Sequence, residues 1–389
     1  MIRIFRGHEL ASLGYADNLG AVKSEFSVSP PRAWAEIDIS ALRRNLSVAR
    51  ETGGAEVMAV VKASAYGHGL EKVAKVFAEE GVAFLGVANV GEARRIRDAG
   101  IEARIYLLGA TWEAERAEIV AQNWTPCLSS IAEADHFNQL ASAAGRKLKA
   151  HLAIDSGMGR GGFLIHELGE TIPVLERMEH LEIEGIGSHL PSADEDEAFT
   201  RRQIDEFRKL IGSLGGEKRF KWRHLLNSAG LLGYDSDLCN LTRPGLMLYG
   251  ASPLAEHQGM LSTAMSLKSR VTLARWLPAG HGISYGRDFV TPKAMKIATV
   301  GIGYGDGYPR HLSGQGAEVF VGGLRCPVLG RVTMDQIMID VTNAPEVGEG
   351  DEVELFGSQI PVTEVAEKAG TIAWEIFTGI TTRVSRQYL

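Results

Sequence analysis

Short apolar runs alternate with amphipathic segments along the chain between residues 57 and 242. The apolar runs have the length of buried parallel strands, and the segments between them repeat apolar positions at helical spacing. The strand-like runs are 57–61, 83–88, 104–108, 126–129, 148–154, 183–188, 224–227 and 241–242. The helical segments between them are 70–80, 92–99, 112–121, 131–144, 168–178 and 197–214. This pattern predicts an α/β fold with eight parallel strands.

Eight strand–helix units in succession favour a (β/α)8 TIM barrel, which we expect over residues 33–261. The alternative is an open doubly wound sheet, which usually contains fewer units. In a barrel, the residues that perform chemistry lie on the loops that follow the carboxyl ends of the strands. The barrel interpretation therefore also predicts where a site lies.

The rhythm changes after residue 261. Short strand-like runs with glycine-rich turns follow, and 362–369 is the one clear helical segment. The runs are 271–276, 294–301, 317–321, 326–330, 337–340 and 352–356. We therefore expect a mostly-β C-terminal domain over residues 262–389. Residues 1–32 form an N-terminal extension that lacks the central apolar block and the cleavage site of a secretory signal.

Composition narrows the class of protein. A chain of 389 residues exceeds the ~250–300 residues of most single cores, which agrees with two domains. The 41 Lys+Arg against 48 Asp+Glu give a net charge of -7, which argues against nucleic acid as a partner. No run approaches the ~18 apolar residues of a membrane helix. The three cysteines are too few and too scattered for a disulfide framework or a four-thiolate zinc site, so we expect a cytoplasmic protein without a metal.

Lys62 follows the first buried strand and is the first candidate for chemistry. Burial at a strand end desolvates the amine, which makes the neutral, nucleophilic form easier to hold. Tyr66 follows on a turn kept narrow by Gly67 and Gly69, and its hydroxyl suits an anion. Taken alone, the stretch is equally compatible with a lysine that reaches the surface and a tyrosine packed at the rim.

Two further candidates follow the fifth and sixth strands. Arg160 ends a glycine-rich turn that begins at Asp155, and its guanidinium suits a carboxylate or phenolate oxygen. His189 follows the sixth strand, where an imidazole can stack on a planar ring or donate a hydrogen bond. The alternatives are a surface arginine on a turn and a satisfied core histidine.

The seventh and eighth strands end in residues suited to phosphate, which barrels usually bind at this place. Asn227 and Ser228 follow the seventh strand, and Arg243 follows the eighth. Ser228 and the backbone N–H groups of Gly245 and Leu246 are suited to an anion, as in other glycine-rich turns. Each segment alone is also compatible with an ordinary strand-to-helix turn.

The C-terminal domain presents tyrosines on glycine-rich turns. Tyr285 lies in Ser-Tyr-Gly, Tyr304 lies in Gly-Tyr-Gly-Asp-Gly, and Met334 and Asp335 lie in Thr-Met-Asp-Gln. The alternative is that these tyrosines pack on a small β core. None of these segments identifies a reaction by itself.

In combination, the motifs resemble the alanine racemase family of fold type III pyridoxal-phosphate enzymes. The resemblance covers roughly residues 33–388 in the family's order. The matching segments are Ala-Trp-Ala-Glu-Ile-Asp at 33–38, Val-Val-Lys-Ala-x-Ala-Tyr-Gly-His-Gly at 60–69, Gly-Met-Gly-Arg at 157–160, Arg-Pro-Gly at 243–245, Ser-Tyr-Gly at 284–286, Gly-Tyr-Gly-Asp-Gly at 303–307 and Met-Asp-Gln at 334–336. The resemblance implies a barrel, a following β domain and pyridoxal 5′-phosphate as cofactor.

The resemblance also implies roles for single residues. Lys62 would hold the cofactor covalently, and Arg243, supported by His224, would face its pyridine nitrogen. The implied cofactor contacts are Lys62, Tyr66, His189, Asn227, Ser228, Arg243, Gly245, Leu246, Tyr304 and Trp374. The implied substrate contacts are Arg160, Met334 and Tyr285, with Asp335 in support. Tyr285, Tyr304 and Met334 would come from the other subunit of a homodimer with shared active sites.

The implied reaction interconverts L-alanine and D-alanine and supplies D-alanine for peptidoglycan. Racemisation needs one base on each face of the substrate Cα, and Lys62 and Tyr285 are the candidates. Both have ordinary pKa values near ~10, so each pKa must be lowered. Arg243 discourages protonation of the pyridine nitrogen and so favours racemisation over side reactions.

Three positions depart from the family pattern. Ala153 replaces a lysine that is often carbamylated and holds the arginine at 160, so Arg160 needs another partner, such as chloride. Trp374 replaces a tyrosine, and Ser64 replaces an acidic or amide residue. The first two leave a serine or broad-specificity racemase as an alternative. A non-catalytic pyridoxal-phosphate carrier is a further alternative, although the β domain that carries Tyr285 argues against it.

Overall fold

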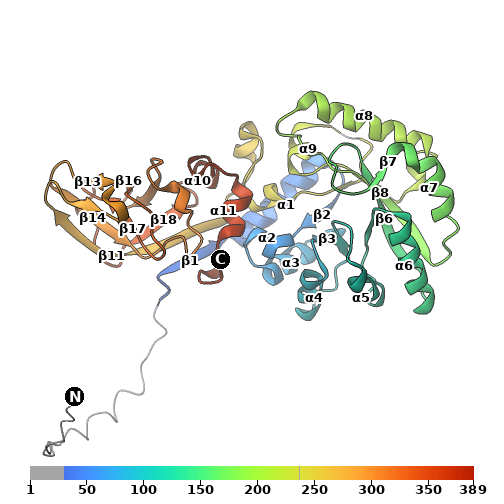
Figure 1. Ribbon diagram of the computed structural model, residues 1–389, viewed down its shortest axis with the longest axis horizontal. Coiled ribbons are helices and arrows are strands. Elements are labelled where there is room, and N and C mark those ends of the chain that lie inside the picture. The colour runs from blue at the N-terminus through green and yellow to red at the C-terminus, as the bar shows by residue number, and fades with distance from the viewer. Residues whose placement is uncertain (1–29, 236) are drawn as a thin grey trace, which may run out of the picture.

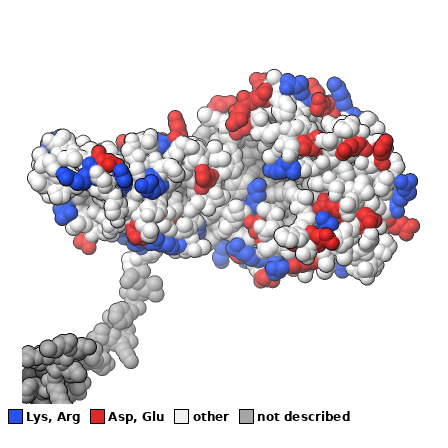
Figure 2. Space-filling model, viewed as in Figure 1, with Lys and Arg blue, Asp and Glu red and all other residues white. Residues whose placement is uncertain are grey.

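The computed structural model describes residues 30–235 and 237–389, so nearly all of the expected extension at 1–32 lies outside the described residues. Figure 1 shows an α/β part, which holds β2 to α9, beside an elongated β-rich part. Among the described helices, none combines the length and the apolarity needed to cross a membrane. On the face shown in Figure 2, basic and acidic side chains are interspersed over both parts.

The strands of the α/β part form two parallel sheets of orders β10-β2-β3-β4 and β5-β6-β8-β9. The first sheet contains β2 (Glu56–Val60), β3 (Phe84–Val87), β4 (Ile105–Leu107) and β10 (Leu241–Thr242). The second contains β5 (Cys127–Leu128), β6 (Leu148–Asp155), β8 (Leu181–Gly187) and β9 (Trp222–His224), and β7 (Phe163–Leu164) pairs with β6. Except for β7, which was not predicted, and β9, these strands occupy the predicted runs.

The two sheets are joined at both of their junctions. β4 and β5 meet in a parallel bridge between Tyr106 and Thr125. Beside β9 and β10, the Asn240 N–H donates to the carbonyl of Arg223 at 3.1 Å, and the Arg243 N–H donates to the carbonyl of Leu226 at 2.9 Å. Hydrogen bonds therefore connect the eight strands in a continuous series that returns to its start.

Helices connect successive strands, and α3 to α8 overlap the helical segments that the apolar pattern predicted. They are α1 (Ile39–Gly53), α2 (Lys62–Tyr66), α3 (Leu70–Glu79), α4 (Val90–Asp98), α5 (Arg116–Ala121), α6 (Ile131–Ala143), α7 (Leu168–Leu175), α8 (Glu197–Ser213) and α9 (Ser228–Gly233). The strand predicted at 224–227 was misplaced, because the observed strand β9 begins at Trp222 and ends at His224. Asn227 instead caps α9, and its side-chain oxygen accepts a hydrogen bond from the Gly230 N–H at 2.9 Å.

The β-rich part is built on one eight-stranded sheet of order β14-β17-β16-β15-β18-β11-β1-β19. Its strands after residue 261 are β11 (Met265–Leu277), β14 (Met295–Val300), β15 (Glu318–Val321), β16 (Leu324–Leu329), β17 (Ile337–Asp340), β18 (Glu352–Phe356) and β19 (Ser385–Tyr388). The hairpin of β12 (Gly282–Ile283) and β13 (Phe289–Val290) lies outside this sheet. The region is mostly β, as expected.

β1 (Ala33–Ile37) belongs to this sheet, although we expected residue 33 to begin the barrel. β1 is antiparallel to β11, with Ala35 opposite Leu267, and parallel to β19, with Ala35 opposite Arg386. An apolar run predicts a strand but not its partners. Here both partners lie more than two hundred residues further along the chain.

Two helices follow β18 at the C-terminal end: α10 (Val362–Ala369) and α11 (Ala373–Gly379). The first was predicted, whereas the second was missed. α11 packs against the turn that follows Lys62, where the rings of Phe377 and His68 meet edge to face at 5.0 Å. The β-rich part therefore contributes directly to the surroundings of Lys62.

Candidate active site

Lys62 lies just after β2, where the chain enters a left-handed turn. The four residues Ala63, Ser64, Ala65 and Tyr66 have φ values of 52° to 56°, which is the left-handed region. Each non-glycine residue in that region costs roughly 1–2 kcal/mol, so the turn persists only because its surroundings hold it. Asn and Asp tolerate this region better than other residues with a Cβ, so Ser64 lacks the tolerance that an aspartate or an asparagine would bring to this position.

The C-terminal segment holds this turn in place. Arg386 Nε donates to the carbonyl of Gly67 at 3.0 Å, and the Tyr388 hydroxyl donates to the carbonyl of His68 at 3.1 Å. A Cβ atom on Gly67 would lie 2.1 Å from the carbonyl oxygen of Phe377, so only glycine fits there. The backbone that carries Lys62 is therefore fixed by residues more than three hundred positions away.

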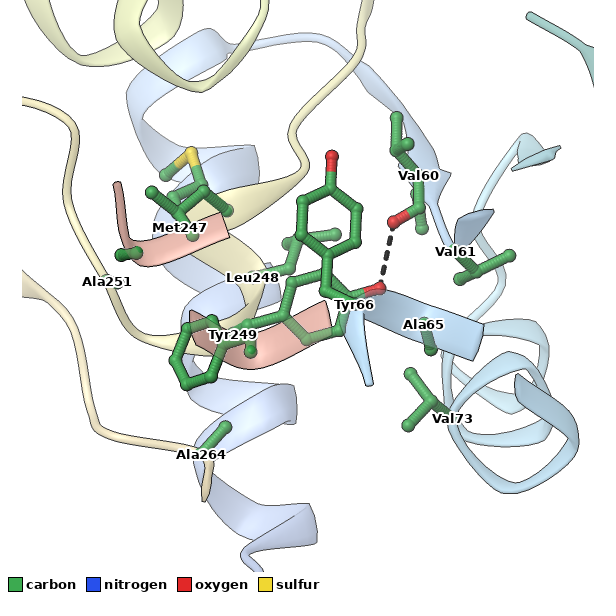
Figure 3. Packing of buried hydrophobic residues seen from close by; sticks show 14 of the residues in the cluster. Val60, Val61, Ala65, Tyr66, Val73, Met247, Leu248, Tyr249, Ala251 and Ala264 are labelled. Atoms are coloured by element: carbon green, nitrogen blue, oxygen red, sulfur yellow. Dashed lines mark hydrogen bonds between the residues drawn. The ribbon is translucent and has the colours of Figure 1, made fainter. Parts of the chain in front are cut away.

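Tyr66 lies at the end of the left-handed turn and is buried. Its ring stacks on that of Tyr249 at a centroid distance of 4.7 Å, and the Tyr249 hydroxyl donates to the carbonyl of Val60 at 2.8 Å (Figure 3). Burial raises the pKa of Tyr66, so its hydroxyl stays protonated and can donate a hydrogen bond. A Cβ atom on Gly245 would lie 2.3 Å from that hydroxyl. Glycine at 245 thus lets the tyrosine reach the backbone.

Ser228, at the start of α9, also contacts the backbone at Gly245. Its buried Oγ accepts from the Gly245 N–H at 2.9 Å and from the Met247 N–H at 3.3 Å. The Asn227 amide donates to the carbonyl of Leu190 at 2.9 Å, which fixes the start of α9. The structure thus brings two hydroxyls and backbone N–H groups together after β9 and β10. Such convergent donors suit an anion.

Arg243 is buried at the centre of the α/β part. It donates to the carbonyl of His224 at 3.0 Å, to His224 Nδ1 and to the carbonyl of Ser188, and it lies 3.3 Å from His189 Nδ1. Within the described chain, none of its ion pairs or hydrogen bonds is to a carboxylate. Burial lowers the pKa of Arg243, but an arginine keeps its charge under ordinary conditions.

The histidines behind Arg243 have defined tautomers. Because the guanidinium only donates, His224 Nδ1 accepts, and the proton of His224 lies on Nε2. This proton is donated to His151 Nδ1 at 2.9 Å, so the proton of His151 lies on Nε2 and faces Glu184 at 3.6 Å. Burial and the charge of Arg243 lower the pKa of both imidazoles, which keeps them neutral.

This series of contacts ends at the buried carboxylate of Glu184. Burial by itself raises the pKa of Glu184, but the N–H of His151 at 3.6 Å and the hydrogen bond from Arg104 hold it at about 2. Two neutral imidazoles therefore lie between the positive charge of Arg243 and its nearest negative partner in the series. Our sequence analysis missed His151 and Glu184, since each lies inside an apolar strand rather than at its end.

Two glycines of β8 make room for these histidines. A Cβ atom on Gly187 would lie 2.2 Å from the ring of His224, and one on Gly185 would lie 2.6 Å from the ring of His151. The Gly-x-Gly spacing places both glycines on one face of the strand.

Replacing Gly187 by alanine should therefore displace His224 and weaken its contact with Arg243. We expect the free energy of unfolding, measured by denaturant titration, to fall by about 1–3 kcal/mol, as in other overpacked cores. Gly212→Ala is the matched control, because a Cβ at that exposed helical position meets nothing within 4 Å. Equal stability of the two variants would contradict the assigned packing.

Cationic groups surround the entrance to the site. Burial lowers the pKa of Lys62, and the charge of Arg160 lowers it further, while Glu92 acts in the opposite direction. Burial and the charges of Arg243, Arg160 and Lys62 hold the pKa of His189 at about 3. The structure thus brings Lys62, Arg160, His189 and Arg243 around one electropositive region.

Arg160 is exposed on its turn. The carboxylate of Asp155 holds this turn by accepting from the N–H groups of Gly157 and Met158 at 2.9 Å and of Gly159 at 3.2 Å. Ala153 is partly buried on β6 and contributes no polar group. Among the described residues, none forms a hydrogen bond or ion pair with the Arg160 side chain that would replace the contact of a lysine at 153.

The candidate residues of the β-rich part do not meet Lys62 within the chain. Tyr285, Tyr304 and Met334 are 71%, 39% and 52% exposed. Figure 1 places β13, which follows Tyr285, at the end of the β-rich part far from β2. Trp374 differs, because it lies partly buried on α11, the helix that packs beside the Lys62 turn.

Local contacts nevertheless fix the turns that carry these residues. The Tyr304 N–H donates to the carbonyl of Thr333 at 3.0 Å, and the Gly305 N–H donates to the carbonyl of Met334 at 2.8 Å. Asp335 accepts from Arg383 at 2.6 Å. Tyr304, Met334 and Asp335 therefore form one local unit.

The chain thus combines an α/β part, with a lysine at the end of a parallel strand, and a β-rich part. The family model for the alanine racemase N-terminal domain matches residues 37–253, and that for the C-terminal domain matches residues 264–388. The chain belongs to the alanine racemase family.

Individual relatives agree with this assignment. The chain is 40% identical over 371 residues to an alanine racemase of Geobacter sp. (strain M21), covering 91% of this chain and 98% of that protein. It is 40% identical over 365 residues to one of Halothermothrix orenii, covering 91% and 96%. Its structure resembles the alanine racemase of a D-cycloserine-producing Streptomyces lavendulae, with a TM-score of 0.85, 34% identity and coverage of 93% and 98%. It also resembles that of Bartonella henselae with covalently bound pyridoxal phosphate, with a TM-score of 0.85, 29% identity and coverage of 92% and 100%.

Proposed function

We propose that this chain is a pyridoxal 5′-phosphate-dependent racemase that interconverts L-alanine and D-alanine. The observation that carries the proposal is the position of Lys62. It is held at the end of a buried strand, in a region that the charges of Arg243 and Arg160 make electropositive. Membership of the alanine racemase family supports the same reaction.

The proposal includes a closed (β/α)8 barrel for the α/β part. The parallel bridge between β4 and β5 and the hydrogen bonds beside β9 and β10 support closure. The boundaries proposed from sequence, 33–261 and 262–389, are kept, except that β1 pairs within the β-rich sheet.

The residues of the site fit pyridoxal phosphate. The hydroxyls of Tyr66 and Ser228 and the N–H groups of Gly245 and Leu246 would hold its phosphate, and Asn227 would fix their loop. The close approach of Tyr66 to Gly245, which a Cβ would block, is the feature of this structure that supports a phosphate cradle. Arg243 would face the pyridine nitrogen, and His189 would lie against the ring. When bound, the cofactor withdraws electrons from the substrate and makes its Cα proton acidic.

The chain's own residues would then move that proton. Lys62 would act as a base on one face of the substrate Cα, and Tyr285 of the partner subunit would act on the other. The 71% exposure of Tyr285, and the place of the following strand β13 at the far end of the β-rich part in Figure 1, support a role for Tyr285 in a partner's site. The molecule would therefore be a homodimer with shared active sites, to which Tyr304, Met334 and Trp374 also contribute. Asp335 would support Met334.

Arg243 would keep the pyridine nitrogen unprotonated. A guanidinium can donate a hydrogen bond but has no proton to give up at ordinary pH. The Arg243 guanidinium donates hydrogen bonds to His224 rather than to a carboxylate, so no negative partner offsets its positive charge there. This arrangement would limit the electron withdrawal by the ring and so suppress side reactions.

Alanine is the proposed substrate, with Arg160 and Met334 near it. Ala153 and Trp374 support a second candidate, a serine or broad-specificity racemase, since both change side chains near Arg160 and the substrate. We also propose a cytoplasmic location, which the burial of all three cysteines supports, and a role in supplying D-alanine for peptidoglycan.

Incubation of the purified protein with single L-amino acids tests the function. We expect D-alanine to form faster than any other D-enantiomer, as measured by chiral chromatography. Faster formation of D-serine would favour the second candidate. If no amino acid racemises while the protein still binds the cofactor through Lys62, the chain is a non-catalytic carrier and the proposal fails.

A further inference from the structure

The first turn of α4 contains a carboxylate that reaches outside its own helix. Asn89 caps α4, and its side-chain oxygen accepts from the Glu92 N–H at 3.0 Å. In an ordinary capping box, a glutamate at this position would bond the N–H of the capping residue itself. Here Glu92 Oε2 accepts instead from the Ala88 N–H at 2.8 Å, and Oε1 accepts from the Ala63 N–H at 2.6 Å. One side chain thus joins the ends of β2 and β3.

The bond to Ala63 acts on the peptide group that directly follows Lys62. At this point the extended strand changes into the left-handed turn, in which the Ala65 N–H donates to the carbonyl of Val61 at 2.8 Å. The first N–H groups of any helical turn have no partner within the turn. Glu92 supplies that partner for Ala63, and so anchors the strained turn at its origin.

The same carboxylate also acts on the Lys62 amine through its charge. Three ionisable groups interact electrostatically with this amine in the described structure: Arg160 after β6, His189 after β8, and Glu92 on α4. Arg160 carries a positive charge and the buried imidazole of His189 is neutral. Glu92 is the anion of this set, and it opposes the lowering of the Lys62 pKa.

We propose that Glu92 is a positioning residue for Lys62, which fixes the backbone that carries the lysine and supplies a negative charge that acts on its amine. The proposal deepens the proposed function, on which its catalytic meaning rests. It does not make Glu92 a base, because its carboxylate is engaged with two backbone N–H groups.

The chain contains a matched control for this device. Ser130 caps α6, and Glu133 stands at the position equivalent to Glu92. Glu133 accepts from the Ser129 N–H at 2.8 Å and from the Thr111 N–H at 3.0 Å, and so joins two other strand ends. No lysine follows the strand there. Replacing Glu133 therefore reports the structural cost of losing such a bridge, without a direct effect on Lys62.

The test compares Glu92→Gln with Glu133→Gln in the full chain. A glutamine keeps the size of the side chain, but it lacks the charge and can accept at one end only. The first measurement is trace acetylation of the cofactor-free proteins with acetic anhydride at several pH values, with Lys62 modification read by mass spectrometry. We expect Glu92→Gln to shift the titration of Lys62 to lower pH, while Glu133→Gln leaves it unchanged.

The second measurement is the Kd for pyridoxal 5′-phosphate, taken from its absorbance. We expect Glu92→Gln to weaken binding roughly fivefold through the lost hydrogen bond. Glu133→Gln should stay within about twofold of wild type. Identical Lys62 titration and Kd in the two variants would overturn the proposal.

Glu92→Asp distinguishes the effect of the negative charge from the effect of the two backbone hydrogen bonds. It also provides a test if Glu92→Gln does not fold. A shorter carboxylate keeps the charge but cannot span both N–H groups. We expect the titration of Lys62 to stay near that of wild type, while the Kd rises. A Lys62 titration that shifts as far as in Glu92→Gln would overturn the electrostatic part. Since neither readout is racemisation, a wild-type chain that fails to racemise alanine would refute the proposed function and leave this test valid.

Discussion

Lys62→Ala is expected to lower the racemisation rate by about 10⁴-fold in both directions, the upper end of the range for a lost acid–base group. Lys62 is proposed both to hold the cofactor and to act as one base, so its loss removes two contributions at once. The low-dielectric position at the end of β2 favours the neutral amine that both tasks require. The charged groups that act on His189 in this region are Arg243, Arg160 and Lys62. Lys62 is the one lysine among them, so none of the others can supply the lost amine.

The rate is measured from purified L- and D-alanine separately, and cofactor binding is followed by absorbance. Lys75→Ala is the control, because Lys75 lies on the exposed face of α3 and pairs loosely with Glu79 at 3.9 Å. We expect this control to retain the wild-type rate. Substantial racemisation by Lys62→Ala would show that another group removes the proton.

Tyr285→Phe is expected to lower the racemisation rate by about 10²–10⁴-fold in both directions. Each direction needs both bases, since one removes the Cα proton and the other returns a proton to the opposite face. The substitution removes only the hydroxyl from a side chain that is 71% exposed, so the fold of the single chain should not change.

Exchange of the Cα proton in D₂O distinguishes a lost base from a general defect. In Tyr285→Phe, Lys62 should still exchange the Cα proton of the enantiomer that presents it to the lysine face, without inversion. Tyr234→Phe is the control. The Tyr234 ring lies on the α/β part, 5.5 Å from Arg201 Cζ, and has no proposed role in the site. Equal loss of exchange for both enantiomers would show that Tyr285 is not a base specific to one face.

The sequence predicted the carboxyl ends of the strands in the α/β part to within one residue, except for β9 and the unpredicted β7, because buried strands have an apolar pattern. Lys62, Arg160, His189 and Arg243 were named as candidates from their places after such runs, and the structure brings them to one region. The pattern also predicted the change to a β-rich part after residue 261. Local periodicity was sufficient for these elements, since neighbours in sequence determine them.

Local periodicity could not predict contacts between residues that are far apart in the sequence. The pairing of β1 with β11 and β19 depends on surfaces formed far along the chain. His151 and Glu184 were missed because a polar residue within an apolar strand resembles a substitution on its exposed face. The Gly-x-Gly of β8 was the available signal, since glycines inside a strand often mark the close approach of another group. The left-handed turn at 63–66 had no such signal beyond Gly67 and Gly69.

The central claim is that each active site combines Lys62 of one subunit with Tyr285 of the other. Coexpression of Lys62→Ala and Tyr285→Phe chains in equal amounts tests it most directly. Half of the dimers would then be mixed, and one of the two sites in each mixed dimer would contain both bases. We expect about a quarter of the wild-type racemisation rate, because random pairing in a two-fold symmetric dimer completes one site in four. A rate no higher than the sum of the two inactive variants would contradict it.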